Sequence, residues 1–330
     1  MMWTWNRLAQ PGLAALAFIA SLFAGSVASA QTYTVTITGG TMALGTVASG
    51  PSGNTNFVIN PSTGAVTVAS GAGSRVSSSS ARATVTIACG NQNSCDTTSP
   101  FIRIGATGSP TGRADPLTSF TMANGTGTLS GAITGSSPID FRLVAIPRNS
   151  SRTIHVGATY PVEDDNSPQG TGDATSGFYV WARATSPPSA GATGSATSTV
   201  YRRISISKTS DISFGRIVRP TTGSATIGIN ASDGARTVGT AVALATPTPT
   251  RAAYTVTGES GRTFSVSLSP FTMTGPPGGS LTVTPTHDAG LSPVLTGGTF
   301  SFNAGASFIL TSTTPGGSYS GSFDVTVVYN

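Results

Sequence analysis

The chain has 330 residues and a formal net charge of +5, but only 9% of its residues are charged, against about 25% in typical soluble domains. The basic residues are scattered arginines apart from Lys208. The clustered positive charge of a nucleic-acid-binding protein is therefore missing, and no nucleic-acid partner is expected. A chain of this length suits two domains, each long enough to bury its own core.

The first 30 residues have the pattern of an export signal. Arg7 precedes an apolar run at residues 13–23, and small residues at 28–30 form a signal-peptidase site. The apolar run is shorter than the roughly 20 residues that a membrane-spanning helix needs. We expect cleavage between Ala30 and Gln31, and export to the periplasm, the outer cell surface or the medium without a transmembrane segment.

Beyond the signal, apolar and polar residues alternate. The alternation is clear at residues 32–38, 81–89, 262–269 and 321–329. It predicts strands with one buried and one solvent-exposed face, as in antiparallel sheets. Gly, Pro, Asn and Asp interrupt these segments about every ten residues, a spacing typical of β-sandwiches and barrels.

Residues 59–68, INPSTGAVTV, predict a β-hairpin. Asn60 can hydrogen-bond its own backbone in an Asx-turn, and Gly64 supplies a residue with left-handed geometry. Residues 229–238, INASDGARTV, repeat this motif 170 positions later, with seven of the ten positions identical.

Cys89 and Cys95 are the only cysteines in the chain. Export would place them in an oxidising compartment, where an even number of cysteines favours a disulfide. The spacing is wider than the C-x-x-C of redox proteins, and two cysteines are too few for a structural zinc site. We predict a structural disulfide that closes a short loop.

His155 and His287 are the only histidines, and neither belongs to a known hydrolase or metalloprotease motif. His155 lies in an alternating segment and is expected to be an ordinary strand residue. His287 is expected in a loop. We expect no enzymatic activity and no cofactor.

One acidic cluster interrupts this neutral sequence, in residues 162–173. It contains Glu163, Asp164, Asp165 and Asp173. Oxygen ligands in a loop suit calcium, which takes about 6 to 8 of them, but the spacing matches no known calcium loop. The main prediction is a solvated turn between two strands, with a calcium loop as the alternative.

Aromatic side chains cluster next, in GFYVWARA. Phe178 is expected on one face of its strand, and Tyr179 and Trp181 on the other. The main prediction for the second pair is a contact at a strand edge or between domains. The alternative is a surface that binds glycans.

Residues 185–199 lack large apolar side chains and are rich in Pro, Ser and Gly, which is typical of a flexible linker. They divide the chain into a first β domain at residues 31–184 and a second at residues 200–330. We interpret the two as a tandem duplication, because further matches keep the same order. Residues 44–47 match 214–217, 155–162 resemble 302–310, and 176–180 resemble 320–325.

Alternating strands are predicted close to both ends of the exported chain, around Tyr33 and Tyr329. Each strand can complete its own domain's sheet. Alternatively, strands of this kind can be exchanged between subunits by β-strand addition. The partners expected are therefore further copies of the chain or other envelope proteins, bound through strand edges.

Four segments of the second half resemble a bacterial exported domain of unknown function, number 4402. The segments are residues 212–223, 252–269, 295–310 and 317–330. The first half resembles the family only through the internal repeat. The resemblance implies an exported protein with no established enzymatic activity, similar in general character to fimbrial subunits. The short cysteine loop departs from chaperone-assembled pilins, whose disulfide joins distant strands.

Together these observations predict an all-β protein with two tandem immunoglobulin-like antiparallel β-sandwich domains after a signal peptide. The expected function is a structural or adhesive role at the cell surface, including that of a fimbria-like subunit. A carbohydrate-binding module and a secreted enzyme are the alternatives.

Overall fold

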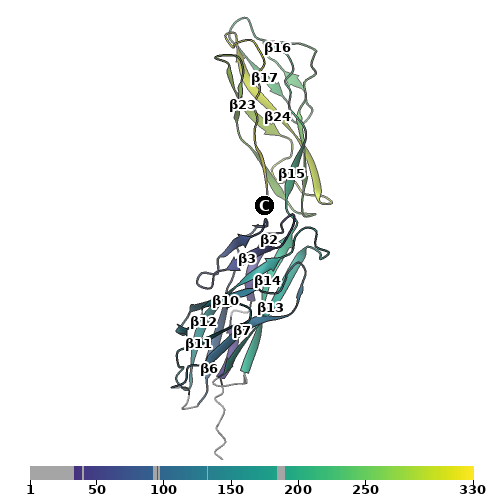
Figure 1. Cartoon of the computed structure of the whole chain (residues 1–330). Helices are drawn as coiled ribbons and strands as arrows, with labels where there is room; N and C mark the ends of the chain where they lie inside the picture. Colours follow the sequence, from purple (N-terminus) through teal and green to yellow (C-terminus); the bar gives the residue numbers. More distant parts are fainter. Residues whose placement is uncertain (1–32, 39–40, 92–94, 96, 132, 184–189) are drawn as a thin grey trace, which may run out of the picture. The chain divides into compact units, whose positions relative to one another are not determined.

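The computed structural model describes residues 33–38, 41–91, 95, 97–131, 133–183 and 190–330 (Figure 1). The predicted signal peptide, its cleavage site between Ala30 and Gln31, and residues 185–189 of the predicted linker lie outside these residues. The described residues form β-strands and no α-helix, so the all-β prediction is confirmed. They also contain no helix with the length and apolar character needed to cross a membrane.

The first domain contains strands β1 to β14. Their bounds are β1 Tyr33–Thr38, β2 Thr41–Ala48, β3 Thr55–Ile59, β4 Val66–Ser70, β5 Ser74–Arg75, β6 Ala83–Cys89, β7 Phe101–Thr111, β8 Ser119–Asn124, β9 Leu129–Ser130, β10 Thr134–Ser136, β11 Ile139–Leu143, β12 Ser150–Val162, β13 Gly172–Arg183 and β14 Ala190–Tyr201.

These strands form two sheets. One has the order β1-β6-β12-β3-β4, with β8 paired to β12 and β10 paired to β8. The other has the order β5-β2-β14-β13-β7-β11-β9. All pairs are antiparallel except β14 and β2, which run parallel. Apolar side chains of both sheets form a single core, in which the rings of Phe120 and Phe178 lie 6.2 Å apart.

The second domain contains strands β15 to β25. Their bounds are β15 Ser205–Ser210, β16 Ile217–Val218, β17 Ser224–Ile229, β18 Arg236–Thr237, β19 Val242–Ala243, β20 Ala252–Thr257, β21 Phe264–Leu268, β22 Phe271–Thr274, β23 Ser280–His287, β24 Thr299–Thr311 and β25 Val325–Tyr329.

One layer of the second domain is a sheet of order β15-β20-β24-β17-β18, with β23 paired to β24 and β22 paired to β23. The facing strands form two separate ribbons, β16-β19 and β21-β25. The buried apolar residues correspondingly form two clusters. The two domains therefore share one complete layer and differ in the other.

The repeated hairpin has the same backbone geometry in both domains. Asn60 accepts a hydrogen bond from Ser62 through its side chain and from the Gly64 amide through its carbonyl. Asn230 does the same with Ser232 and Gly234. The two glycines have φ angles of 77° and 73°, where a residue with a Cβ would be strained. The turn therefore retains asparagine and glycine for geometric reasons.

Residues 190–199 of the predicted linker are not a linker. They belong to β14, which lies in the interior of its sheet, with β13 on one edge and β2 on the other. Small side chains misled the sequence analysis because Gly, Ala, Ser and Thr are also typical of loops. Here their small size suits a strand that faces large side chains, and the two neighbouring strands supply its hydrogen bonds.

The predicted disulfide between Cys89 and Cys95 is present. It ties the end of β6 to the connection that follows it. Cys89 is 3% exposed and Cys95 is fully buried, and both belong to the core of the first domain. The bridge therefore anchors the loop to the core.

Candidate functional site

The acidic cluster of residues 162–173 does not converge on one point. Glu163 accepts a hydrogen bond from the Ser167 hydroxyl, and Asp164 accepts one from the Gly53 amide. Asp173 accepts one from Thr199 at 3.0 Å. In the part of the chain that the structure describes, no three acidic, histidine or cysteine side chains form a group able to hold a metal ion. Each of these three carboxylates therefore accepts a hydrogen bond from another group of the protein.

The fourth member of the cluster, Asp165, pairs with a buried arginine that sequence analysis missed. Arg113 is 1% exposed, and its Nη1 lies 2.8 Å from Asp165 Oδ1. The same nitrogen donates to Ser49 Oγ at 2.8 Å, and Nε donates to the Gln169 carbonyl at 3.1 Å. This ion pair joins the acidic loop to the segments that directly follow β2 and β7, so it holds three connections of the first domain together.

Tyr179 and Trp181 lie on the outer face of β13, as predicted, but β13 lies between β14 and β7, so the prediction of a strand-edge contact is wrong. Their rings are 4.5 Å apart, and Trp181 is 37% exposed. Each ring lies across a glycine of a neighbouring strand: a Cβ on Gly105 would lie 2.5 Å from the Tyr179 hydroxyl oxygen, and one on Gly191 would lie 2.3 Å from Trp181 Cδ1. The aromatic pair therefore covers bare backbone of the sheet.

Charged groups lie beside this aromatic pair. Arg103 donates two hydrogen bonds to Asp140, at 2.6 and 2.7 Å. These bonds lower the pKa of the Asp140 carboxyl and keep it ionised. Arg183 stacks over the Phe101 ring at 4.5 Å. A small hollow of about 40 Å³ lies between Phe101, Arg103, Trp181 and Arg183.

The two histidines lie in different domains. His155 is on β12, where its Nδ1 lies 3.2 Å from the Thr84 hydroxyl. Burial, with a smaller contribution from Arg82, lowers the pKa of His155. His287 ends β23, so the prediction that it lies in a loop is wrong, and its ring meets Phe302 edge to face.

The second domain has a groove with a volume of about 1160 Å³. It lies between residues 211–219 and residues 314–323. Phe308 and Leu310 of β24 and Phe271 of β22 line it further. These aromatic and aliphatic side chains line part of the groove, and charged side chains such as Arg216 and Arg219 also line it.

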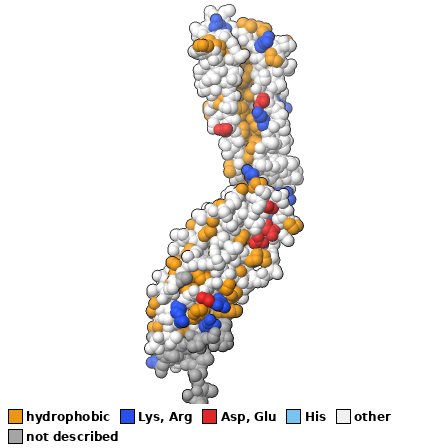
Figure 2. All heavy atoms as spheres, viewed as in Figure 1, with side chains coloured by type: hydrophobic (Ala, Val, Ile, Leu, Met, Phe, Trp, Pro, Cys, Tyr) orange, Lys and Arg blue, Asp and Glu red, His pale blue; other side chains and the backbone are white. Residues whose placement is uncertain are grey.

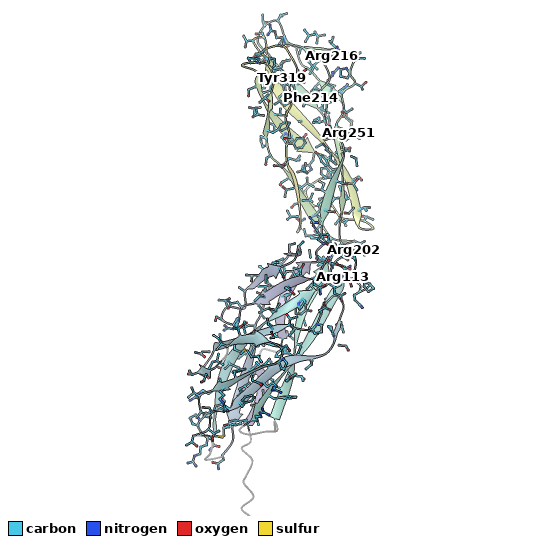
Figure 3. The ribbon with its side chains drawn as sticks, in the orientation of Figure 1. Arg113, Arg202, Phe214, Arg216, Arg251 and Tyr319 are labelled. Carbon is cyan, nitrogen blue, oxygen red and sulfur yellow. A yellow bond between two sulfur atoms is a disulfide. The ribbon has the colours of Figure 1, made fainter. Side chains whose placement is uncertain are left out.

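Phe214 lies against Phe308 in this groove, with ring centroids 4.8 Å apart and the rings nearly perpendicular. Phe214, Arg216 and Tyr319 are at the same end of the second domain (Figure 3). Figure 2 shows a stripe of hydrophobic side chains along the visible face of this domain, with few charged groups beside it. The sequence patterns that predicted individual strands gave no sign of this groove, because it depends on which strands are neighbours.

One family model matches most of the second domain. Residues 204–329 match the family described as "Domain of unknown function (DUF4402)". The predicted resemblance is confirmed for this half, and the match does not extend to the first domain. No curated protein matches the chain.

Among solved structures, one similar chain comes from work titled "Chaperone-tip adhesin complex is vital for synergistic activation of CFA/I fimbriae biogenesis". The sequences are 12% identical, and the TM-score is 0.23. The alignment covers 88% of this chain and 96% of that chain.

Proposed function

We propose that this protein is a non-enzymatic structural or adhesive component of the cell envelope or cell surface, and that it acts by binding other proteins through strand edges. The groove of the second domain carries this proposal. It places aromatic and aliphatic side chains of the main sheet beside residues 211–219, most of which are not in a strand, and such a surface suits an extended polypeptide better than a small metabolite.

Two further observations support the proposal. The disulfide between Cys89 and Cys95 suits an oxidising compartment outside the cytoplasm. The low content of charged residues permits close association with other neutral surfaces, because few charged groups need to be desolvated.

Cell fractionation combined with immuno-electron microscopy tests the proposal. We expect the protein in the envelope or on the cell surface, in complexes that survive mild shearing. A Leu291→Asp variant, altered at a side chain that is 98% exposed and outside the groove, should be found in the same fractions. A freely diffusing monomer in the medium, or a cytoplasmic protein, would contradict the proposal.

A second candidate function is glycan binding on the outer face of the first domain. The aromatic pair Tyr179 and Trp181 lies beside Arg103 and Asp140, and aromatic faces with nearby hydrogen-bonding groups suit sugar rings. Glycan-array binding that is lost in Trp181→Ala would favour this function. It should persist in Val144→Ala, which removes a comparably exposed apolar side chain. Equal binding by both variants would exclude it.

A further inference from the structure

The first domain contains a strand that shows how the groove can be filled. Strand β14 lies between β13 and β2, antiparallel to the first and parallel to the second. Its residues from Ser195 to Tyr201 pair with β2 from Thr41 to Ala48. This strand joins the two halves of its sheet and completes the core.

The second domain has counterparts of β2 and β13 but no counterpart of β14 between them. The counterpart of β13 is β25 with the residues before it, because residues 320–325 resemble residues 176–180. Adding 170 to the numbers of β2 gives residues 211–218, which are one wall of the groove. The equivalence holds in the backbone: Ala43 bridges to Ala81 as Ser213 bridges to Thr250. The strand β25 pairs with β21 on one edge, and no strand of the described residues pairs with its other edge.

The exposure of the side chains in the two domains shows which residues the added strand would cover. Met42, Leu44 and Val47 of β2 are fully buried. Their counterparts Ile212, Phe214 and Ile217 are only half-buried. At the end of the wall, Ala48 is 3% exposed and its counterpart Val218 is 49% exposed. The apolar residues of the second domain are therefore placed for a strand that the domain does not supply.

We propose that this groove binds an extended segment of a different protein as an added β-strand, parallel to residues 211–218. The proposal rests on the proposed function and specifies its binding site. Eight residues of strand span about 26 Å at roughly 3.3 Å per residue, so the segment would form a long backbone ladder. Backbone hydrogen bonds would supply affinity, and alternate side chains would enter the groove.

The described strands of the chain itself are poor donors, because they already belong to sheets. The best of them is β1, an edge strand with alternating Tyr, Val and Ile. To leave its sheet, β1 would have to expose Tyr33 and Val35, which are 0% and 8% exposed, and give up its ladder with β6. A segment that is not already folded into a sheet avoids this cost, which favours a different protein over a second copy.

A difference in the floor of the groove specifies the chemistry of the segment. In the first domain, the Ser198 hydroxyl of β14 donates to the Tyr160 hydroxyl of β12 at 3.3 Å. The position equivalent to Tyr160 on β24 is Phe308, which has no hydroxyl. The segment should therefore carry an apolar side chain at the position of Ser198, and apolar or small residues at the positions of Ala196 and Val200.

Synthetic peptides test this directly on the full chain without its signal peptide. The probe is the β14 sequence, residues 191–201, in a version with Ser198→Val. We expect it to bind at least tenfold more tightly than a scrambled peptide of the same composition, and more tightly than the unaltered β14 peptide. Equal binding of probe and scrambled peptide, or no binding of either, would overturn the proposal.

Variants of the groove locate the binding. Phe214→Asp and Ile217→Asp should each weaken binding of the probe at least tenfold, while Leu291→Asp should leave it unchanged. Circular dichroism and thermal melting check that each variant is folded. If an aspartate variant is unfolded, Ile217→Ser replaces it, because a smaller polar side chain at this half-buried position should be tolerated. Binding of the probe to Ile217→Ser should then be weakened. Unchanged binding by folded groove variants would contradict the assignment.

Cross-linking determines direction and register. Thr46 pairs with Thr199, and Thr41 pairs with Ser195, so the counterparts are Arg216 and Asp211. A peptide with Thr199→Cys should form a disulfide with Arg216→Cys and not with Asp211→Cys, whereas a peptide with Ser195→Cys should do the reverse. The opposite pattern would mean an antiparallel strand and would overturn the predicted direction.

Measuring self-association shows whether the added strand comes from a second copy of the chain or from a different protein. We expect the full chain to be monomeric by light scattering at micromolar concentration, with the groove free for the probe. Oligomers that are lost in Phe214→Asp would show that a second copy is the donor and would overturn the assignment to a different protein. Failure of peptide binding together with a cell-surface location would reject this inference while leaving the proposed function intact.

Discussion

The two domains have the same hairpin and the same first layer, but they close their cores differently. In the first domain β14 joins β2 and β13 into one seven-stranded sheet, and the apolar residues form one core. In the second domain the corresponding strands remain two separate ribbons, and the buried residues form two clusters that share contacts with Ile212. A single central strand therefore decides whether this architecture is closed or open.

The comparison also shows that an open sheet need not lose its remaining structure. The second domain keeps its main sheet and its aromatic contacts, including the stacked rings of Tyr254 and Phe302 at 5.3 Å. Without a counterpart of β14, the side chains of Ile212, Phe214 and Ile217 remain only half-buried. Unpaired strand edges are normally blocked in soluble proteins because they promote association, so an edge left open beside an apolar groove is typical of a binding surface.

The ion pairs provide the largest expected contrast between the domains. Asp165→Ala would leave the buried Arg113 without its partner, and we expect the free energy of unfolding of the first domain to fall by about 4 kcal/mol. The second domain has the exposed pair Lys208 and Asp211, so Asp211→Ala should cause no measurable change. Denaturant unfolding, with hydrogen exchange to assign each domain, measures both. Similar losses in the two variants would contradict the contrast.

A pair of glycines tests whether the shared layer is equivalent. A Cβ on Gly157 would lie 2.0 Å from the Ile59 carbonyl oxygen, and one on Gly305 would lie 2.0 Å from the Ile229 carbonyl oxygen. Alanine at either position should destabilise its own domain by about 3 kcal/mol, because the backbones must separate. Gly170→Ala is the control, because nothing lies near its Cβ position; Gly53→Ala is unsuitable, because the φ of Gly53 is 70°. Clearly unequal losses of stability in Gly157→Ala and Gly305→Ala would contradict the equivalence of the two layers.

The core residues at the central strand should respond unequally. Leu44→Ala removes a fully buried side chain and should cost the first domain about 3 kcal/mol. Its counterpart Phe214 is half-buried beside the groove, so Phe214→Ala should cost the second domain only about 1 kcal/mol, despite the larger side chain. Thermal and denaturant unfolding of the full chain measure both losses. A loss at Phe214 as large as that at Leu44 would mean that the second core is already closed.

The smallest effect concerns the hydroxyl that only the first domain has. Tyr160→Phe leaves Ser198 without its partner and should cost about 1 kcal/mol near neutral pH. Burial raises the pKa of Tyr160 to about 12, so its neutral form stabilises the fold at pH values below about 10. That contribution is lost as the pH rises through 12. The loss of stability of the first domain between these pH values should therefore be smaller in Tyr160→Phe, and an unchanged profile would contradict the assignment.

Prediction from sequence succeeded where the structure is local. Alternation located the strands around Val85, Val266 and Val325, and the cysteine spacing identified the disulfide. The aromatic pair Tyr179 and Trp181 was correctly placed on one face of its strand, because side chains alternate along any strand. Whether that face binds glycans stays a prediction, since the same geometry also covers glycines of the neighbouring strands.

Prediction failed where the outcome depends on neighbours. Residues 190–199 have the composition of a linker, yet two adjacent strands make them the centre of a sheet. Arg113 has no local feature that marks it as buried, because its partners Ser49, Asp165 and Gln169 are distant in the sequence. The acidic loop predicted as one cluster is distributed among separate hydrogen-bond donors for the same reason.

The sequence by itself determined which segments are strands, which face of each is apolar and how the repeated hairpin turns. These properties follow from the alternation of side chains and from backbone geometry at single residues such as Asn60 and Gly64. Only the tertiary structure decided which strand lies beside which, and hence that the second domain has an open groove where the first is closed. Strand pairing is made by backbone groups common to all residues, so the sequence of a strand carries little information about its neighbour.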